Sequence, residues 1–174
     1  RKMDVDLRGV AASTGPSAHQ AATRFGFGYA ATEWQRIVDD ASVDAVLIAT
    51  RHDLHPTIAA AALGAGKAVF LEKPMASTMA DCDLIVNEAK KAKGSFMVGH
   101  ICRFNPRYRM AKQAIEAGKI GKIVAMSSRR NIPAAWTPEI LNKIGPIVGD
   151  AIHDTDLMLW FIGDRITTAY AQTV

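Results

Sequence analysis

The chain has 174 residues, of which 49% are hydrophobic, so it is long enough to bury a core of one domain or slightly more. Its longest apolar runs are far shorter than the roughly 20 residues that a membrane-spanning helix needs. The first residues show no apolar core of a signal peptide. These features argue against a membrane partner and lead us to expect a cytoplasmic protein.

The charged residues and cysteines exclude several other classes. The net charge is +4, from 21 basic and 17 acidic residues, and the basic residues are spread out apart from Arg129-Arg130 and Lys90-Lys91. A nucleic-acid partner would require a clustered basic surface, so we expect none, whereas an anionic small molecule suits this balance. Cys82 and Cys102 are too few for a disulfide framework or a zinc site, so we expect reduced thiols and no metal.

The first hundred residues alternate between apolar β-rich runs and helix-like runs, which indicates βαβ units and a parallel sheet. The predicted strands are residues 7–12, 45–49, 68–71 and 96–98. The predicted helices are residues 17–25, 33–40, 55–65 and 79–93, with Ser17 and Thr78 as N-caps. The strands are continuously apolar rather than alternating, as expected where helices cover both faces of a sheet.

A different pattern follows Gly99. We expect a helix at residues 106–117, an alternating strand at 122–129, an irregular stretch at 131–149, a helix at 150–162 and a strand at 166–174. The prediction is an α/β protein: a partial Rossmann-like, doubly wound parallel sheet in residues 1–100, then the start of an α+β substrate-binding domain with a mostly antiparallel sheet in 101–174. Since no first strand or glycine-rich phosphate-binding turn is recognisable, we expect an internal piece of a longer enzyme.

Candidate site residues follow the predicted strands, where open α/β sheets bind their ligands. After the first strand, Ser13 and Thr14 offer uncharged hydroxyls near a cofactor's ribose, or simply cap the next helix, which local sequence favours. After the second, Thr50, Arg51 and His55 suit contacts to a nucleotide, but equally form an ordinary polar loop.

The segment FLEKPMA ends the third strand with Glu72, Lys73 and Pro74. A proline restricts the residue before it and makes a cis peptide bond accessible, so Lys73 would be held rigidly. A desolvated amine facing an oxidised nicotinamide has a lowered pKa and can relay protons. The alternative, a surface Glu-Lys turn, is the commoner fate of such a tripeptide.

A fourth cluster begins the helix near residue 150. Asp150, His153 and Asp156 are spaced three apart and lie on roughly one helical face. A carboxylate beside an imidazole raises its basicity, as a general base for an alcohol proton requires. Alternatively, the acids interact with the helix dipole and His153 is a packed core residue, which is the more common case for a single histidine.

In combination these motifs resemble the glucose-fructose oxidoreductase, inositol dehydrogenase and rhizopine-catabolism (Gfo/Idh/MocA) family. The resemblance covers nearly the whole chain, in order: DAVLIAT followed by His55, AALGAGKAVFLEKPMA, VGHICRFNP, AGKIGKIVAMSSRR and IHDTDLMLWFIGD. It implies a dehydrogenase that transfers hydride between NAD(P) and a CH–OH group of a sugar, polyol or related carbohydrate.

The resemblance also implies roles for individual residues. Lys73 matches the family's catalytic lysine, and His153 matches the histidine that takes the proton of the substrate hydroxyl, with Asp150 as its carboxylate partner. Thr50, His55 and Glu72 match positions near the cofactor, and Arg103 lies in the segment at the floor of the active site. We count Ser13, Thr14, Arg51, Lys73 and Arg103 among the cofactor contacts as well.

Three departures from the family pattern affect this transfer. The aspartate that many relatives carry four residues before the histidine is replaced by Gly149, with Asp150 one residue later. Arg51 replaces a common proline, and Ser13 replaces the aspartate of NAD-preferring members, which favours NADP slightly. The third departure is that no glycine-rich fingerprint is recognisable in this sequence.

A competing hypothesis is a non-catalytic regulator of the same fold that senses a dinucleotide or sugar. Retention of both Lys73 and His153 favours catalysis, because a binding module needs neither amine nor imidazole. Relatives often pair through the second-domain sheet, so a homo-oligomer is a further expectation.

Overall fold

The computed structural model describes residues 5–131, 133, 135, 145 and 147–172. The chain divides into two compact units, Arg1–Gly99 and His100–Val174, which are described separately. No helix among the described residues is long and apolar enough to cross a membrane.

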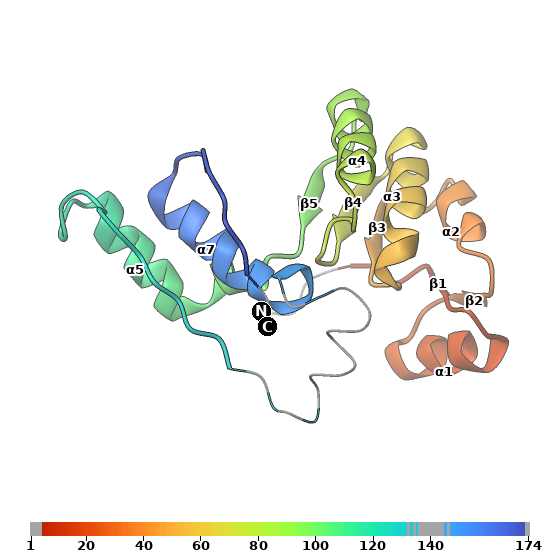
Figure 1. Ribbon diagram of the computed structural model, residues 1–174. Helices are drawn as coiled ribbons and strands as arrows, with labels where there is room; N and C mark the ends of the chain where they lie inside the picture. The colour runs from red at the N-terminus through yellow and green to blue at the C-terminus, as the bar shows by residue number, and fades with distance from the viewer. Residues whose placement is uncertain (1–4, 132, 134, 136–144, 146, 173–174) are drawn as a thin grey trace. The chain divides into compact units, whose positions relative to one another are not determined.

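The described residues of the first unit form five short strands in two parallel groups (Figure 1). One group pairs β1 (Gly9–Ala11) with β2 (Tyr29–Ala31). The other has the order β3 (Ala45–Ile48), β4 (Ala68–Leu71), β5 (Phe96–Val98). The groups match positions 3-2 and 4-5-6 of the doubly wound order 3-2-1-4-5-6, and the described residues supply no strand between them. The Rossmann-like α/β prediction is confirmed.

Each strand is followed by a helix except β5, which leads into the second unit. The helices are α1 (Gly15–Phe25), α2 (Gln35–Asp39), α3 (His55–Gly64) and α4 (Met79–Lys91), with a short 3-10 turn, η1 (His52–Leu54), before α3. Thr78 caps α4 by accepting the amide of Asp81, as predicted. The cap of α1 is Thr14 rather than Ser17, because the hydroxyl of Thr14 accepts the Ser17 amide and the helix begins two residues earlier.

The core of this unit lies on one face of the β3–β4–β5 sheet. Val46, Ile48, Val69 and Leu71 are buried there against α3 and α4, which lie side by side (Figure 1). On the other face Leu47 is 69% exposed. The continuous apolar runs predicted helices on both faces of the sheet, whereas in the described residues α3 and α4 cover one face and Leu47 is exposed on the other.

The described residues of the second unit form helices and turns joined by irregular segments. It contains the 3-10 turn η2 (Ile101–Phe104), α5 (Pro106–Glu116), a π-helical turn η4 (Ile147–Ala151) and α7 (Ile152–Ile162). Helices α5 and α7 are in contact, partly through the rings of Tyr108 and Phe161.

The strand predictions need correction at three places: one strand was missed, and two predicted segments are not strands. Strand β2 was not predicted, because Tyr29–Ala31 is too short to show a repeating pattern of apolar residues. Residues 122–129 and 166–172 are not strands, so the antiparallel sheet is not confirmed. A strand requires a hydrogen-bonded neighbour, and among the described residues none pairs with either segment; Val124 is 94% exposed. Residues 173–174 and most of 131–149 lie outside the described part.

Candidate active site

The candidate residues of the first unit follow the carboxyl ends of its strands. Strands β3 and β4 are parallel neighbours, with Ile48 opposite Leu71, so the loops after them emerge at the same edge of the sheet. The first loop contains Thr50 and the second contains Glu72 and Lys73. The structure therefore brings the second and third predicted clusters together.

Ser13 and Thr14 lie after β1, in the turn into α1. Both are exposed, and the Thr14 hydroxyl is used within the turn: it accepts the amide of Ser17 and donates to the Ser17 hydroxyl at 2.9 Å. The capping role is thus present, while the Ser13 hydroxyl lies on the surface. Contact of either residue with a ribose stays a prediction.

The loop after β3 has an exposed side. Thr50 is exposed and donates its hydroxyl to the carbonyl of Arg51 at 3.2 Å. The Arg51 side chain is 82% exposed and forms two hydrogen bonds with Asp53, at 3.1 and 3.0 Å. Such a surface pair is weak. The guanidinium can therefore exchange Asp53 for another anion at small cost.

His55 lies on the opposite, interior side of the same loop. Its side chain is 1% exposed, Nδ1 lies 2.8 Å from the carbonyl oxygen of Pro74, and Nε2 lies 3.1 Å from that of Thr50. Both ring nitrogens are therefore occupied by backbone carbonyls of the two loops. A direct contact of His55 with a cofactor stays a prediction, and this geometry does not favour it.

The Glu72-Lys73-Pro74 turn is partly buried. Its first amide continues the sheet, since Glu72 N–H donates to Ile48 O at 2.9 Å, and the Lys73 amide donates to the Glu72 carboxylate at 3.1 Å. The Lys73–Pro74 peptide bond is cis and Pro74 is buried. Lys73 thus lies in a partly buried turn, between Glu72, whose amide bonds to β3, and the buried Pro74.

Arg103, in the second unit, is held by a carboxylate of α7. Its Nε and one terminal nitrogen donate to the two oxygens of Asp156 at 2.8 and 2.5 Å, and Asp156 is 8% exposed. These hydrogen bonds raise the pKa of Arg103 above its ordinary value. His100 Nδ1 lies 3.7 Å from the same carboxylate. Asp156 was predicted to lie on roughly one helical face with Asp150 and His153, and its carboxylate accepts two hydrogen bonds from Arg103.

Asp150 and Asp154 are associated with a second arginine. Arg130 donates hydrogen bonds to both carboxylate oxygens of Asp154. Asp154 also accepts a hydrogen bond from the Ser128 hydroxyl at 2.8 Å. The Nε atom of Arg130 lies 3.6 Å from the Asp150 carboxylate. The hydrogen bond from Arg130 is the main cause of the lowered pKa of Asp154. The role of Asp150 as partner of His153 stays a prediction.

Sequence reasoning did not find Arg130 or the Arg103–Asp156 pair. Arg130 was noted only as half of a basic dipeptide, and Arg103 was assigned by resemblance to the cofactor. Helical spacing relates residues within α7, but carries no information about a partner 53 residues away.

Comparison with known proteins supports the family that the sequence motifs resemble. Residues 1–100 match the model of the GFO_IDH_MocA oxidoreductase family with an NAD-binding Rossmann fold, and residues 108–174 match the GFO/IDH/MocA C-terminal domain. The chain belongs to the Gfo/Idh/MocA family.

Two curated members of this family illustrate the similarity. Inositol 2-dehydrogenase 2 of Saccharopolyspora erythraea is 37% identical over 139 residues, covering 79% of this chain and 40% of that protein. Levoglucosan dehydrogenase of Pseudarthrobacter phenanthrenivorans is 33% identical over 168 residues, covering 91% and 43%. The chain thus spans less than half the length of these relatives.

Solved structures of family members agree with the fold. Levoglucosan dehydrogenase in complex with NADH and levoglucosan has a TM-score of 0.79 at 31% identity, covering 91% of this chain and 45% of that one. Apo scyllo-inositol dehydrogenase from Lactobacillus casei has a TM-score of 0.83 at 29% identity, covering 90% and 47%.

The residues present fit the dinucleotide that the family fold binds. Exposed hydroxyls of Ser13 and Thr50 lie in the loops after β1 and β3, and α1 begins directly after Thr14. Hydroxyls and a helix start at the carboxyl ends of parallel strands suit the sugar and phosphate groups of NAD(P).

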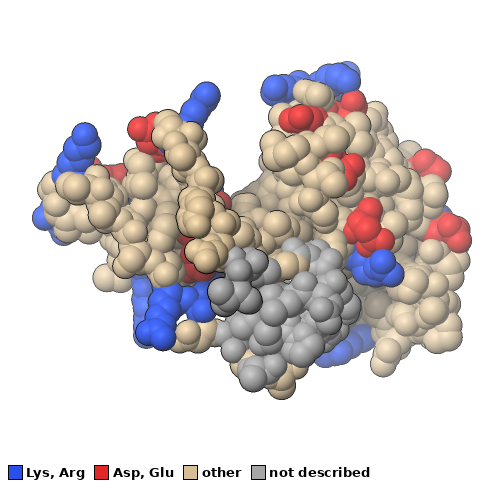
Figure 2. Space-filling view, viewed as in Figure 1, with Lys and Arg blue, Asp and Glu red and all other residues tan. Residues whose placement is uncertain are grey.

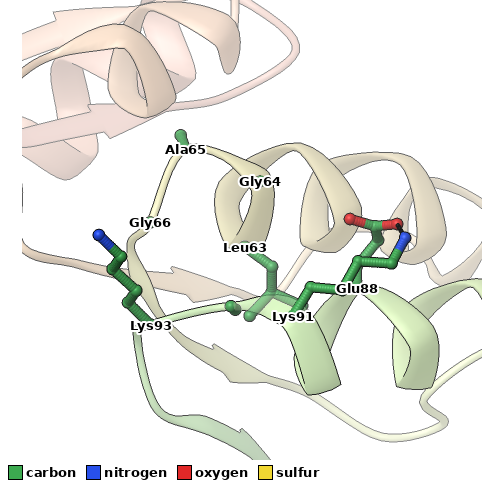
Figure 3. Close-up of a pocket in the computed structure, with 8 residues that line it drawn as sticks. Leu63, Gly64, Ala65, Gly66, Glu88, Lys91 and Lys93 are labelled. Carbon is green, nitrogen blue, oxygen red and sulfur yellow. Dashed lines mark hydrogen bonds and ion pairs between the residues drawn. The ribbon is translucent and has the colours of Figure 1, made fainter.

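A groove elsewhere in the first unit is separate from this site (Figure 3). It lies between the last turns of α3 and α4 and the turns into β4 and β5, and therefore at the opposite edge of the sheet from Lys73. In it Lys91 is turned toward Glu88, with which it pairs at 2.8 Å, while Lys93 points away. The family's carboxyl-edge site is thus unrelated to this groove.

Proposed function

We propose that the protein is an NAD(P)-dependent oxidoreductase that transfers hydride between the nicotinamide and a CH–OH group of a sugar, polyol or related carbohydrate. The observation that carries the proposal is the fixed Glu72-Lys73-Pro74 turn beside Thr50 at the carboxyl edge of a Rossmann-like sheet. The similarity to inositol and levoglucosan dehydrogenases supports the substrate class.

In this proposal Lys73 and His153 share the proton chemistry. The amine of Lys73 donates a hydrogen bond to the reacting oxygen and stabilises the negative charge that develops there. His153 accepts the hydroxyl proton, with Asp150 favouring its charged form. When bound, the nicotinamide supplies the hydride acceptor or donor. Residues 1–100 serve as a partial dinucleotide-binding domain and 101–174 as the beginning of the substrate-binding domain.

Cofactor binding in this proposal involves the exposed residues at the carboxyl edge. Ser13, Thr14 and Thr50 bind ribose hydroxyls or phosphate oxygens, and Glu72 orients the turn through the Lys73 amide. Arg51 is available for an anionic group, because its side chain is 82% exposed and its pairing with Asp53 is a surface pair. The absence of an acidic side chain at Ser13 favours NADP over NAD.

Three further expectations stay predictions: the cytoplasmic location, self-association through the second-domain sheet and the absence of a nucleic-acid partner. On the face drawn in Figure 2, Lys and Arg lie in small groups separated by acidic and uncharged residues, which agrees with a small-molecule ligand.

The test is turnover by the intact protein. With saturating NAD or NADP and a panel of inositols, aldoses, anhydrosugars and polyols, we expect a nicotinamide absorbance change at 340 nm for at least one of them. The reverse assay uses the corresponding ketones with NADH or NADPH. Cofactor binding without turnover in either direction would instead favour the regulator.

A further inference from the structure

We infer that His55 is a positioning residue that fastens the Lys73–Pro74 turn to the loop after β3, and so fixes the backbone from which the Lys73 amine extends. The inference rests on the proposed function. It replaces the expectation that His55 contacts the cofactor directly.

The first observation is the position of the ring. His55 is 1% exposed and is the first residue of α3, whose following Pro56 is also buried. Its Nδ1 lies 2.8 Å from Pro74 O and its Nε2 lies 3.1 Å from Thr50 O. A ring this deeply buried with both nitrogens in hydrogen-bond contact has no polar atom left to offer a ligand.

The second observation is where the sheet ends. The last backbone hydrogen bond between the two segments runs from Glu72 N–H to Ile48 O at 2.9 Å. Past this bond, in the described residues, the backbones of the two loops form no direct hydrogen bond with each other. The imidazole bridges them instead, and therefore extends the connection between β3 and β4 to the site.

The third observation concerns hydrogen-bond chemistry. Carbonyl oxygens only accept, so an imidazole with one proton donates to one of the two carbonyls, and a doubly protonated ring donates to both. The shorter distance is to Pro74, the carbonyl directly after Lys73. We therefore assign the functional contact to Nδ1–Pro74 O.

Three variants separate the two contacts. In His55→Asn the side-chain amide takes roughly the place of Nδ1, and in His55→Gln roughly the place of Nε2, whereas His55→Ala loses both. Leu63→Ala is the matched control: Leu63 is also 1% exposed on α3, but lies at the other end of the helix, in the groove of Figure 3.

In the intact protein, we expect His55→Ala and His55→Gln to lower kcat about 10- to 100-fold with little change in cofactor KM, because a small displacement of a reacting group costs this much. His55→Asn should recover most of kcat, and Leu63→Ala should keep it at a temperature where the protein stays folded. Equal kcat for the Asn and Gln variants, or a loss in cofactor KM instead of kcat, would overturn the inference.

Hydrogen exchange distinguishes this inference from the proposed function. The Lys73 amide should exchange faster in His55→Ala and His55→Gln than in the wild type and His55→Asn, whether or not a substrate is found. If the wild-type protein turns over no substrate but this pattern holds, only the proposed function fails. Unchanged Lys73 exchange in all variants would contradict the positioning role.

Discussion

Arg103 and Asp156, 53 residues apart in sequence, form two charge-assisted hydrogen bonds at 2.8 and 2.5 Å. The carboxylate is 8% exposed, while the guanidinium side chain is 41% exposed and lies 5.9 Å from the centre of the Trp160 ring. The pair connects the turn after β5 to α7, the helix that carries His153. Arg103 thus supports the second unit's part of the candidate site.

Replacing Arg103 by alanine should destabilise the protein, because it leaves the Asp156 carboxylate buried without its main partner. A half-buried pair of this kind is expected to cost about 1–3 kcal/mol in free energy of unfolding, below the range for fully buried pairs. Urea denaturation of the intact protein measures it. Arg109→Ala, at an exposed position of α5, is the control, and equal losses in both variants would contradict the prediction.

Gly94 should not tolerate a side chain. A Cβ there would lie 2.3 Å from the carbonyl oxygen of Lys67, in the backbone of the neighbouring turn. Gly94→Ala is therefore expected to lower the free energy of unfolding by about 1–3 kcal/mol. At Gly64, on α3, nothing lies within 4 Å of an added Cβ, so Gly64→Ala should be neutral or stabilising by up to about 1 kcal/mol. Thermal unfolding that ranks the two variants the other way would refute this.

Asp40 should make the first unit acid-sensitive. Hydrogen bonds from the Ser42 hydroxyl and amide, and from Tyr29, lower the pKa of its carboxyl from 3.8 to about 2. Because the folded pKa is the lower one, the stabilisation is complete above pH 3.8 and is lost as the pH falls toward 2.

The Asp40→Asn variant should therefore lose stability less steeply than the wild type between pH 4 and pH 2, measured by urea denaturation at each pH. Asp39→Asn, an exposed neighbour, provides the control. Identical pH profiles for Asp40→Asn and wild type would show that these hydrogen bonds do not act on stability.

Local sequence predicted those parts of the site that follow directly from a strand. Thr50 and Lys73 come within a few residues of buried strands, and parallel neighbours place their carboxyl ends together, so the motifs were found without coordinates. The helices were predicted to within a few residues because polar caps such as Thr78 mark where they begin.

The remaining features depend on contacts between distant segments. The partners of His55 are backbone carbonyls, which every residue has. No sequence pattern therefore distinguishes a buried histidine that joins two loops from one that contacts a ligand. Arg103 pairs with Asp156, and Arg130 Nε lies 3.6 Å from Asp150; helical spacing had placed both carboxylates on the face of His153. The alternation in residues 122–129 predicted a strand, but a strand also needs a partner that the segment itself does not specify.

Lys73→Met should reduce kcat about 100-fold or more while leaving cofactor affinity nearly unchanged, because loss of one donor that stabilises the charge on the reacting oxygen costs this much. Lys73→Arg should not restore the rate, since the larger planar guanidinium cannot place its charge where the compact ammonium group lies. Steady-state kinetics and a fluorescence titration with NADPH measure the two effects. Lys90→Met, exposed on α4, serves as the control, and an unchanged rate in Lys73→Met would remove Lys73 from the mechanism.

Ser13→Asp should shift the cofactor preference from NADP toward NAD. The residue is exposed directly after β1, where a carboxylate accepts hydrogen bonds from the ribose hydroxyls and repels a 2′-phosphate. A hydrogen bond to a charged group contributes about 1.5–3 kcal/mol, so the ratio of kcat/KM for NAD to that for NADP should rise about 10-fold or more. Ser13→Asn keeps a hydrogen-bonding side chain without the charge and should leave the ratio within a few-fold of the wild type. If both variants shift the ratio equally, the charge at this position does not select the cofactor, and the preference must be set by other residues around the ribose.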